Sequence, residues 1–261
     1  MSILIRITIA LLFSSCVFAP VWAEDSPTQA EPKKPVIAVM VSDDLYDADK
    51  LLPPLMEKLA KENGWEIAVI HGHGTANFPN IGVLEKSDAL VIFIRRLALP
   101  TVQLDVVKKF IATGHGVVAI RTASHGFNSG ERPFAEGCEN WAAFDKEVLG
   151  CSYHGHGSNE SGLEVTNVAS LLDSPILKGV EPNQWHSESA LYFCDPFKDD
   201  ITVYQTASSP EVKDSPLTWT RIHGKTRVAY TSLGHQKDFE VKAFQVLLGN
   251  LVEWVRQPQQ P

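Results

Sequence analysis

Clusters of basic residues are missing from this chain of 261 amino acids, which has 23 Lys and Arg residues against 31 Asp and Glu residues. Its adjacent basic pairs, Lys33-Lys34, Arg95-Arg96 and Lys108-Lys109, fall in three separate segments. Nucleic acids and anionic membranes attract proteins through concentrated positive charge. A net charge of −8 without such a cluster argues against both as partners.

Long apolar runs are also scarce, and the one that approaches the length of a membrane helix lies at the N-terminus. It contains Arg6 and ends in a small-residue cleavage motif at Ala23, before Glu24. The run is short for a membrane span, and it continues past Cys16, which disfavours a lipoprotein anchor. We expect a signal peptide over 1–23, export to the periplasm or the medium, and no stable membrane insertion after cleavage.

Cysteine is rare as well, and three remain after the predicted cleavage: Cys138, Cys151 and Cys194. A helix predicted over 139–149 would hold Cys138 and Cys151 roughly 15 Å apart, whereas a disulfide needs Cα atoms within about 7 Å. A bridge between Cys151 and Cys194 and a set of three buried thiols both remain open.

Residues 24–35 are polar and proline-rich, which predicts a flexible linker. One α/β domain is predicted over 36–256, followed by a disordered tail over 257–261. Its first half alternates β-rich apolar runs with helical periodicity. Strands are predicted over 36–42, 65–70, 88–94 and 116–120, and helices over 47–64 and 99–114. This order indicates a mostly parallel sheet with helices on both faces.

The second half of the domain is less regular. After the helix over 139–149, strands are predicted over 162–167, 201–206, 216–221 and 227–233, the last two forming a hairpin through Gly224. Apolar residues at helical spacing predict a closing helix over 239–256. No heptad or edge-strand signal indicates an oligomeric state.

Polar residues follow the predicted strands at the points where ligands bind in such sheets. Asp43 and Asp44 follow the first strand, Arg95 follows the third, and Arg121 and His125 follow the fourth. We expect them to converge on one rim, although each could also simply face water. A guanidinium directly after a buried strand needs an anionic or strongly hydrogen-bonding partner, so Arg121 either pairs with a carboxylate such as Asp43 or Asp44 or binds a ligand oxygen.

Several long stretches, in this order, resemble the ThuA-like trehalose-utilisation family and in particular its secreted bacterial variants. They include SDDLYDADKLLPPLMEKLA, RRLALPTVQLDVVKKFIATGHGVVAIRTASHGF, FDKEVLGCSYHGHGSN, SPILKGV and PLTWTRIHGKTRVAYTSLGH. The resemblance implies a three-layer α/β/α, flavodoxin-like fold of the class I glutamine amidotransferase type. It also implies a role in carbohydrate use, often beside dehydrogenases that make 3-keto sugars.

The resemblance also implies site residues, because the family's polar motifs fall on His154, His156, Glu188 and His235. Arg121 stands where many relatives have histidine, which replaces a neutral base or metal ligand with a permanent cation. AIRTAS occupies the position of the amidotransferase nucleophile but contains no cysteine, so glutamine amidotransferase chemistry is excluded. The other His-Gly-His-Gly copy, with His71 and His73, has no such support and is interpreted as loop.

Two mechanisms remain open for the cleavage of an oxidised (3-keto) glycoside or a related sugar by a hydrolase or lyase. In the first, His154, His156 and His235 hold a divalent metal such as zinc. In the second, no cofactor binds; a histidine acts as base, Glu188 as acid, and Arg121 stabilises the oxyanion.

The expected partner is a small carbohydrate, contacted by Asp43, Arg95, His125, Tyr153 and Trp219, the last matching the tryptophan of the family's hairpin. The alternative to an enzyme is a carbohydrate-binding accessory or receptor domain without catalysis.

Overall fold

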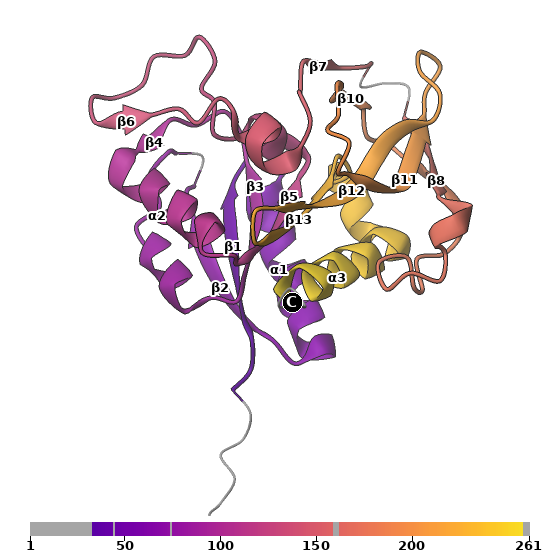
Figure 1. The fold of residues 1–261 in the computed structure, drawn as a ribbon, viewed down its shortest axis with the longest axis horizontal. Coiled ribbons are helices and arrows are strands. Elements are labelled where there is room, and N and C mark those ends of the chain that lie inside the picture. Colours follow the sequence, from indigo (N-terminus) through magenta and orange to yellow (C-terminus); the bar gives the residue numbers. More distant parts are fainter. Residues whose placement is uncertain (1–32, 44, 74, 159–161, 258–261) are drawn as a thin grey trace, which may run out of the picture. The chain divides into compact units, whose positions relative to one another are not determined.

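A nine-stranded sheet is the centre of the computed structural model, which describes residues 33–43, 45–73, 75–158 and 162–257. The strands lie in the order β2-β1-β3-β5-β13-β12-β11-β8-β9 (Figure 1). The signal peptide, most of the linker and nearly all of the tail lie outside the described residues, so export stays a prediction. Within the described part of the chain, no helix combines the length and hydropathy that a membrane crossing requires.

The sheet strands are β1 (Val36–Ser42), β2 (Glu66–His71), β3 (Ala89–Ile94), β5 (Gly116–Ile120), β8 (Leu163–Asn167), β9 (Gln184–Ser187), β11 (Thr202–Ser208), β12 (Ser215–His223) and β13 (Thr226–Thr231). The α-helices are α1 (Ala48–Asn63), α2 (Thr101–Ala112) and α3 (Lys242–Arg256). Shorter elements are the strands β4 (Leu99–Pro100), β6 (Cys138–Glu139), β7 (Gly155–His156) and β10 (Tyr192–Phe193), and the helical turns η1 (Ile81–Lys86), η2 (Arg121–His125), η3 (Asp145–Leu149), η4 (Ala169–Leu171) and η5 (Gln236–Glu240).

The parallel half of the sheet has the doubly wound, flavodoxin-like order. Strand β1 pairs in parallel with both β2 and β3, β3 pairs with β5, and β5 pairs with β13. The chain therefore leaves β1 towards one edge of the sheet and returns to its other side at β3. Ligands bind at such a reversal point, beyond the carboxyl ends of the strands. The remaining strands β12, β11, β8 and β9 extend the sheet in antiparallel order.

Two hydrophobic cores flank the sheet and explain why its central strands are apolar throughout. In β3 all six residues are buried, with Val91 packed into the core under α1 and α3 and its neighbour Ile92 packed into the core under α2. Successive side chains of a strand point to opposite faces, so a strand covered on both faces has no polar positions. Figure 1 shows α2 on one side of the sheet and α1 and α3 on the other. The three-layer α/β/α fold is confirmed.

The prediction of a helix over 139–149 is wrong for most of that segment, because the residues before 144 are not helical. Residues of β6 pair instead with β4, and the backbone N–H of Trp141 donates to the carbonyl of Phe127 at 2.7 Å. The pairing holds residues 138 and 139 in extended backbone, which a helix that begins at 139 cannot adopt. A short π-helical turn, η3, forms only at the end of the segment and ends at Gly150, whose φ of 77° suits glycine.

The three cysteines are free thiols. Cys151 and Cys194 are both buried, and the backbone N–H of Ser152 donates to the Cys194 carbonyl at 2.9 Å. Contact with Cys194, together with burial, raises the pKa of the Cys151 thiol. Neither alternative holds in full: Cys151 and Cys194 are not joined by a disulfide, and Cys138 is half-buried rather than buried.

Candidate functional site

Side chains that follow β1, β3 and β5 meet at the carboxyl rim of the parallel sheet, next to the reversal point between β1 and β3. They reach it through unusual backbone: Arg96 after β3 has φ 52° and Arg121 after β5 has φ 48°. A non-glycine residue in this left-handed region stores roughly 1–3 kcal/mol of strain and often marks a functional site. The rim therefore concentrates both charge and strain.

Arg121 is a buried charge at the rim, with 1% of its surface exposed. Its guanidinium carbon lies 4.2 Å from the centre of the Tyr46 ring and 4.8 Å from that of Tyr192. Its Nη1 donates to the Ser232 carbonyl at 2.9 Å, while its buried Nε has no hydrogen-bond partner. The prediction that Arg121 touches substrate is not supported by this placement, because two aromatic rings cover the guanidinium; it can act only through them.

Asp43, predicted to bind substrate, is also buried, at 1% exposed. Its carboxylate accepts from the Thr122 hydroxyl at 2.8 Å and from the backbone N–H groups of Leu45 at 2.8 Å and Tyr46 at 3.2 Å. Burial raises the pKa of Asp43. These bonds, rather than an ion pair with Arg121, occupy the carboxylate. Asp43 therefore holds the loop that presents Tyr46, and its predicted contact with substrate is corrected; Asp44 lies outside the described residues.

His125 lies at the end of η2 in a pocket of about 380 Å³. Its ring stacks on Tyr153 with centroids 4.2 Å apart, and its Nδ1 lies 3.1 Å from Ser124 Oγ. Burial, followed by the positive charges of Arg96 and Arg95, lowers the pKa of His125 to about 3. The imidazole is therefore neutral at physiological pH.

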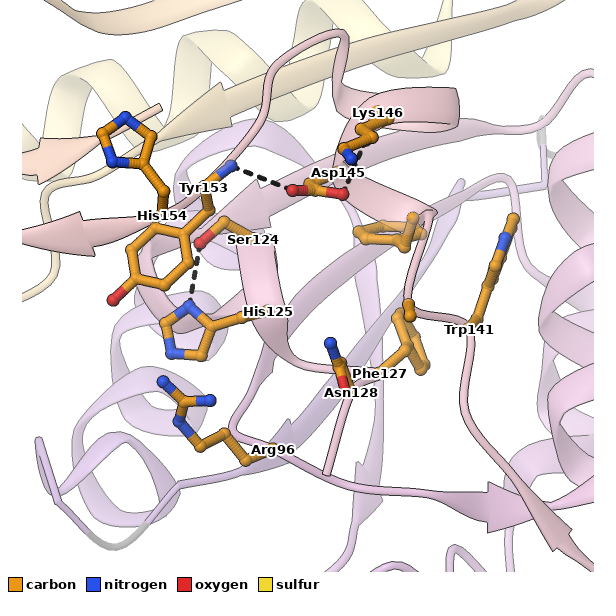
Figure 2. Close-up of a pocket in the computed structure, with 12 residues that line it drawn as sticks. Arg96, Ser124, His125, Phe127, Asn128, Trp141, Asp145, Lys146, Tyr153 and His154 are labelled. Carbon is orange, nitrogen blue, oxygen red and sulfur yellow. Dashed lines mark hydrogen bonds between the residues drawn. The ribbon is translucent and has the colours of Figure 1, made fainter. Parts of the chain in front are cut away.

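The pocket combines aromatic faces with hydrogen-bonding groups (Figure 2). Trp141 and Tyr153 supply aromatic surface, and Asn128, Arg96 and Lys146 supply polar and charged groups. Such a lining suits a sugar, whose C–H faces pack on rings while its hydroxyls need hydrogen-bond partners. Figure 2 shows the Arg96 side chain directed towards the ring of His125.

Asp145 also lines the pocket, on the side opposite His125 (Figure 2). Its two carboxylate oxygens accept from the backbone N–H groups of Lys146 at 2.8 Å and of Tyr153 at 2.9 Å. Burial raises its pKa. Asp145 therefore shapes the wall that carries Tyr153.

Of the predicted histidine pair, His154 precedes β7 and His156 lies on it, and β7 pairs with β10 so that His156 is opposite Tyr192. The His156 ring stacks on Tyr192 with centroids 6.0 Å apart, and its Nδ1 lies 2.8 Å from the Gly157 carbonyl. His154 lines the pocket that holds His125, and its Nε2 lies 2.9 Å from Asp195 Oδ1, a bond that lowers the pKa of Asp195. Of the pair, His156 is the one that stacks on Tyr192, part of the aromatic cover of Arg121.

His235 lies on the far side of that cover, with its ring centroid 6.3 Å from that of Tyr46. Burial, followed by the charge of Arg121, lowers its pKa. Glu188 is exposed and forms an ion pair with Lys237 at 3.1 Å, and this hydrogen bond lowers the pKa of Glu188. A carboxyl group held in its charged form is a poor proton donor, so the predicted role of Glu188 as acid is corrected.

The predicted metal ligands are not brought together. His156 and His235 are separated by Tyr192, Arg121 and Tyr46, which lie in contact in that order. Among the described residues, no three His, Cys, Asp or Glu side chains are grouped as a metal would need. The residues present do not fit the predicted zinc site.

Two other predictions concern residues outside the site. Trp219, predicted to bind substrate, is a core residue with 1% exposure whose Nε1 donates to the Leu149 carbonyl at 2.9 Å. It has no free surface for a ligand, and that prediction is corrected. His71 and His73, interpreted as loop, stack on each other with centroids 3.9 Å apart at the end of β2.

Comparison with known proteins gives the family. A family model described as ThuA, trehalose utilisation, matches residues 39–255. The chain belongs to the ThuA family. No curated protein matches it.

Solved structures agree with this ThuA assignment. A ThuA-like protein of Bacteroides uniformis is 16% identical, with a TM-score of 0.64 and coverage of 88% of this chain and 95% of that chain. A ThuA-like protein of Parabacteroides merdae is also 16% identical, with a TM-score of 0.65 and coverage of 88% and 93%. A cytoplasmic protein of Salmonella typhimurium LT2 is 14% identical, with a TM-score of 0.56 and coverage of 85% and 99%. Identities this low show the shared fold alone.

Sequence reasoning about this ThuA protein missed Tyr46 and Tyr192, the two rings that cover Arg121. Tyr46 lies in the segment SDDLYDAD, and Tyr192 lies in the same motif as Glu188, HSESALYF. The sequence signal that could have predicted these rings is Arg121 itself, because a buried guanidinium packs readily on aromatic faces.

The neutral state of His125 makes the stability of this ThuA protein depend on pH. Its pKa is about 3 when folded, against an ordinary value of 6.5, so below pH 6.5 only the unfolded chain takes up the proton. The free energy of unfolding therefore falls as pH drops from 6.5 towards 3, and the effect is absent at higher pH. We expect wild type to lose about 2–3 kcal/mol more than His125→Gln between pH of about 7 and about 4.5.

Urea unfolding of both proteins at the two pH values measures this difference, because titration of all other groups cancels in the comparison. An equal loss in wild type and variant would show that folded His125 titrates normally.

Proposed function

We propose that this ThuA-family protein binds an oxidised, carbonyl-bearing sugar in the rim pocket and cleaves its glycosidic bond by acid–base chemistry. The observation that carries the proposal is the neutral imidazole of His125, which lies beside the guanidinium of Arg96 in a pocket with aromatic walls. A neutral imidazole is a suitable hydrogen-bond donor to a carbonyl oxygen that gains negative charge. A 3-keto glycoside offers such a carbonyl two carbons from the glycosidic bond.

His125 and Arg96 have the role of stabilising negative charge. The Ser124 hydroxyl has a single hydrogen and lies 3.1 Å from Nδ1 of His125 and 3.2 Å from the Arg121 carbonyl, which also accepts from it. The proposal requires the donation to Nδ1, which puts the hydrogen of His125 on Nε2, where it is available to the ligand. Fixed donors aimed at a developing oxyanion are among the largest contributions to catalysis. The pKa of about 3 makes His125 itself a weak base, so the proton must go elsewhere.

His156 has the role of base. Its Nδ1 lies 2.8 Å from a carbonyl oxygen, that of Gly157, which can only accept, so Nδ1 carries the hydrogen and Nε2 has a free lone pair. His156 is exposed and close enough to His125 that its charge depresses the pKa of His125. The pocket lining includes His154 rather than His156, so the proposal requires the sugar to extend from His125 towards β7 for His156 to reach it.

The proposed reaction balances with these groups alone. His156 removes the proton on C2, next to the keto group at C3, and the electron pair moves onto the C3 oxygen as an enolate held by His125 and Arg96. The carbonyl then re-forms, a C1=C2 double bond forms, and the C1–O bond breaks. Protonated His156 returns the proton to the departing sugar oxygen.

Incubation with a 3-keto-disaccharide tests the proposal, with the unoxidised disaccharide as the control substrate. We expect monosaccharide release from the keto sugar alone, unchanged by a chelator. Release that stops on chelation would favour the metal-assisted mechanism over the acid–base one. Binding of the keto sugar without release would overturn cleavage and leave a carbohydrate-binding domain, and no binding at all would overturn the proposal.

A further inference from the structure

We infer, on the basis of the proposed function, that the sugar bound in the rim pocket carries a negatively charged group, a carboxylate or a phosphate, recognised by Arg96 with Arg95 beside it. The two guanidiniums follow β3 at the reversal point of the sheet, and Arg96 lines the pocket. The substrate class is then an anionic sugar, and its binding can be measured separately from cleavage.

Neither arginine has a protein partner that explains its charge. Among the described residues the guanidinium ion pairs are Arg221 with Asp200 and Arg256 with Glu253, and Arg95 and Arg96 are in none. This is not for want of carboxylates, since the chain has 31 acidic residues against 23 basic ones. Two adjacent cations left unpaired in an acidic protein point to a ligand that supplies the missing charge.

Two carboxylates of the rim are already occupied. Asp145, in the same pocket, accepts two backbone hydrogen bonds, and Asp43, close enough to Arg95 to be affected by its charge, accepts from Thr122 and two backbone N–H groups. Lys146 adds a further cation to the lining. The groups that face the ligand are therefore positive overall.

The backbone at Arg96 is consistent with a placed side chain. Its φ of 52° is a conformation that costs a non-glycine residue stability, so surrounding structure must hold it there. Gly130, across from it, would place a Cβ 3.6 Å from Nη1 of Arg96, an ordinary contact, so the loop leaves the guanidinium room beside it. In Figure 2 the guanidinium lies next to His125, at the same end of the pocket.

A guanidinium fork binds a carboxylate or phosphate through two parallel hydrogen bonds, which a neutral group of the same shape cannot replace. Titration calorimetry with two matched pairs of probes therefore tests the inference: glucuronate against glucuronamide, and glucose 6-phosphate against glucose. We expect the charged member of one pair to bind at least about tenfold more tightly than its neutral partner, with the preference shrinking as salt rises. The pair that shows the preference identifies carboxylate or phosphate.

Three variants connect the preference to Arg96. Arg96→Met should abolish the preference for the charged probe, and Arg96→Lys, which keeps the charge without the fork, should retain part of it. Arg227→Met is the matched control: Arg227 lies near the start of β13, at the opposite end of the strands, over the ring of Trp254 at 4.8 Å. Thermal unfolding confirms that each variant is folded.

Equal affinity for charged and neutral probes, no binding of any probe, or a preference that survives in Arg96→Met would each overturn the inference. Release of monosaccharide from a neutral keto sugar, with no preference for charge, would overturn the inference alone. A charge preference without cleavage would uphold the anionic subsite and overturn the cleavage step.

Discussion

Replacing Asp238 by alanine will lower the free energy of unfolding by about 3–5 kcal/mol, because it removes the acceptor for three buried donors and one partly buried donor. The carboxylate is 1% exposed and accepts from Ser187 Oγ at 2.6 Å and Ser189 Oγ at 2.8 Å. It also accepts from the backbone N–H groups of Gly234 at 2.8 Å and His235 at 3.0 Å. Loss of its charge further leaves the buried guanidinium of Arg121 with less compensation.

Urea unfolding with linear extrapolation measures the change. Asp105→Ala, on the exposed surface of α2, is the matched control and should change stability by no more than about 0.5 kcal/mol. A loss below about 1 kcal/mol for Asp238→Ala would show that water or rearranged side chains satisfy the four donors. The network would then not be what joins the end of β9 to the segment after β13.

The parallel half of the fold was predictable because its strands are buried on both faces. A run such as 88–94 has no polar interruption, and the structure places its alternate residues in two different cores. Helix α1 also ends where glycine predicts, at Gly64 with φ 76°. Strand β9 was missed because an edge strand with two exposed positions, Gln184 and His186, has little apolar signal.

The site was predictable only as far as the topology determines it. Polar residues after β3 and β5 had to reach the carboxyl rim, and Arg95 and His125 do so. Which of them remain open to a ligand depends on what covers them, and the cover of Arg121 comes from Tyr46 and Tyr192, in segments far from it in the chain. The prediction that Trp219 binds substrate was wrong for the same reason, because its position in a motif does not show that it is buried.

A buried cation under two tyrosines connects the separate parts of the rim. Tyr46 touches the side that carries His235, and Tyr192 touches the side that carries His125 and His156. Burial raises the pKa of Tyr192, so its phenol stays protonated beside the guanidinium. Arg121 thus has a positioning role: it fixes the rings against which the histidines pack.

The base proposed for cleavage gives the largest expected loss of activity. We expect His156→Ala to lower kcat for a 3-keto-disaccharide by about 10²- to 10⁴-fold, the usual contribution of a positioned base, with little change in KM. The reason is that the lone pair on Nε2, left free by the bond from Nδ1 to the Gly157 carbonyl, has no equivalent in the variant. Initial rates of monosaccharide release, across a range of substrate concentrations, separate kcat from KM.

His115→Ala is the matched control, because His115 precedes β5 at the opposite end of the strand from His125 and stacks on Phe110 with centroids 4.6 Å apart. It should leave both constants within about twofold of wild type, since it removes an imidazole without touching the rim. A His156→Ala protein that retained full kcat would transfer the role of base to another group. His154 would then be the next candidate, because its bond to Asp195 orients it in the way that a carboxylate orients a catalytic imidazole.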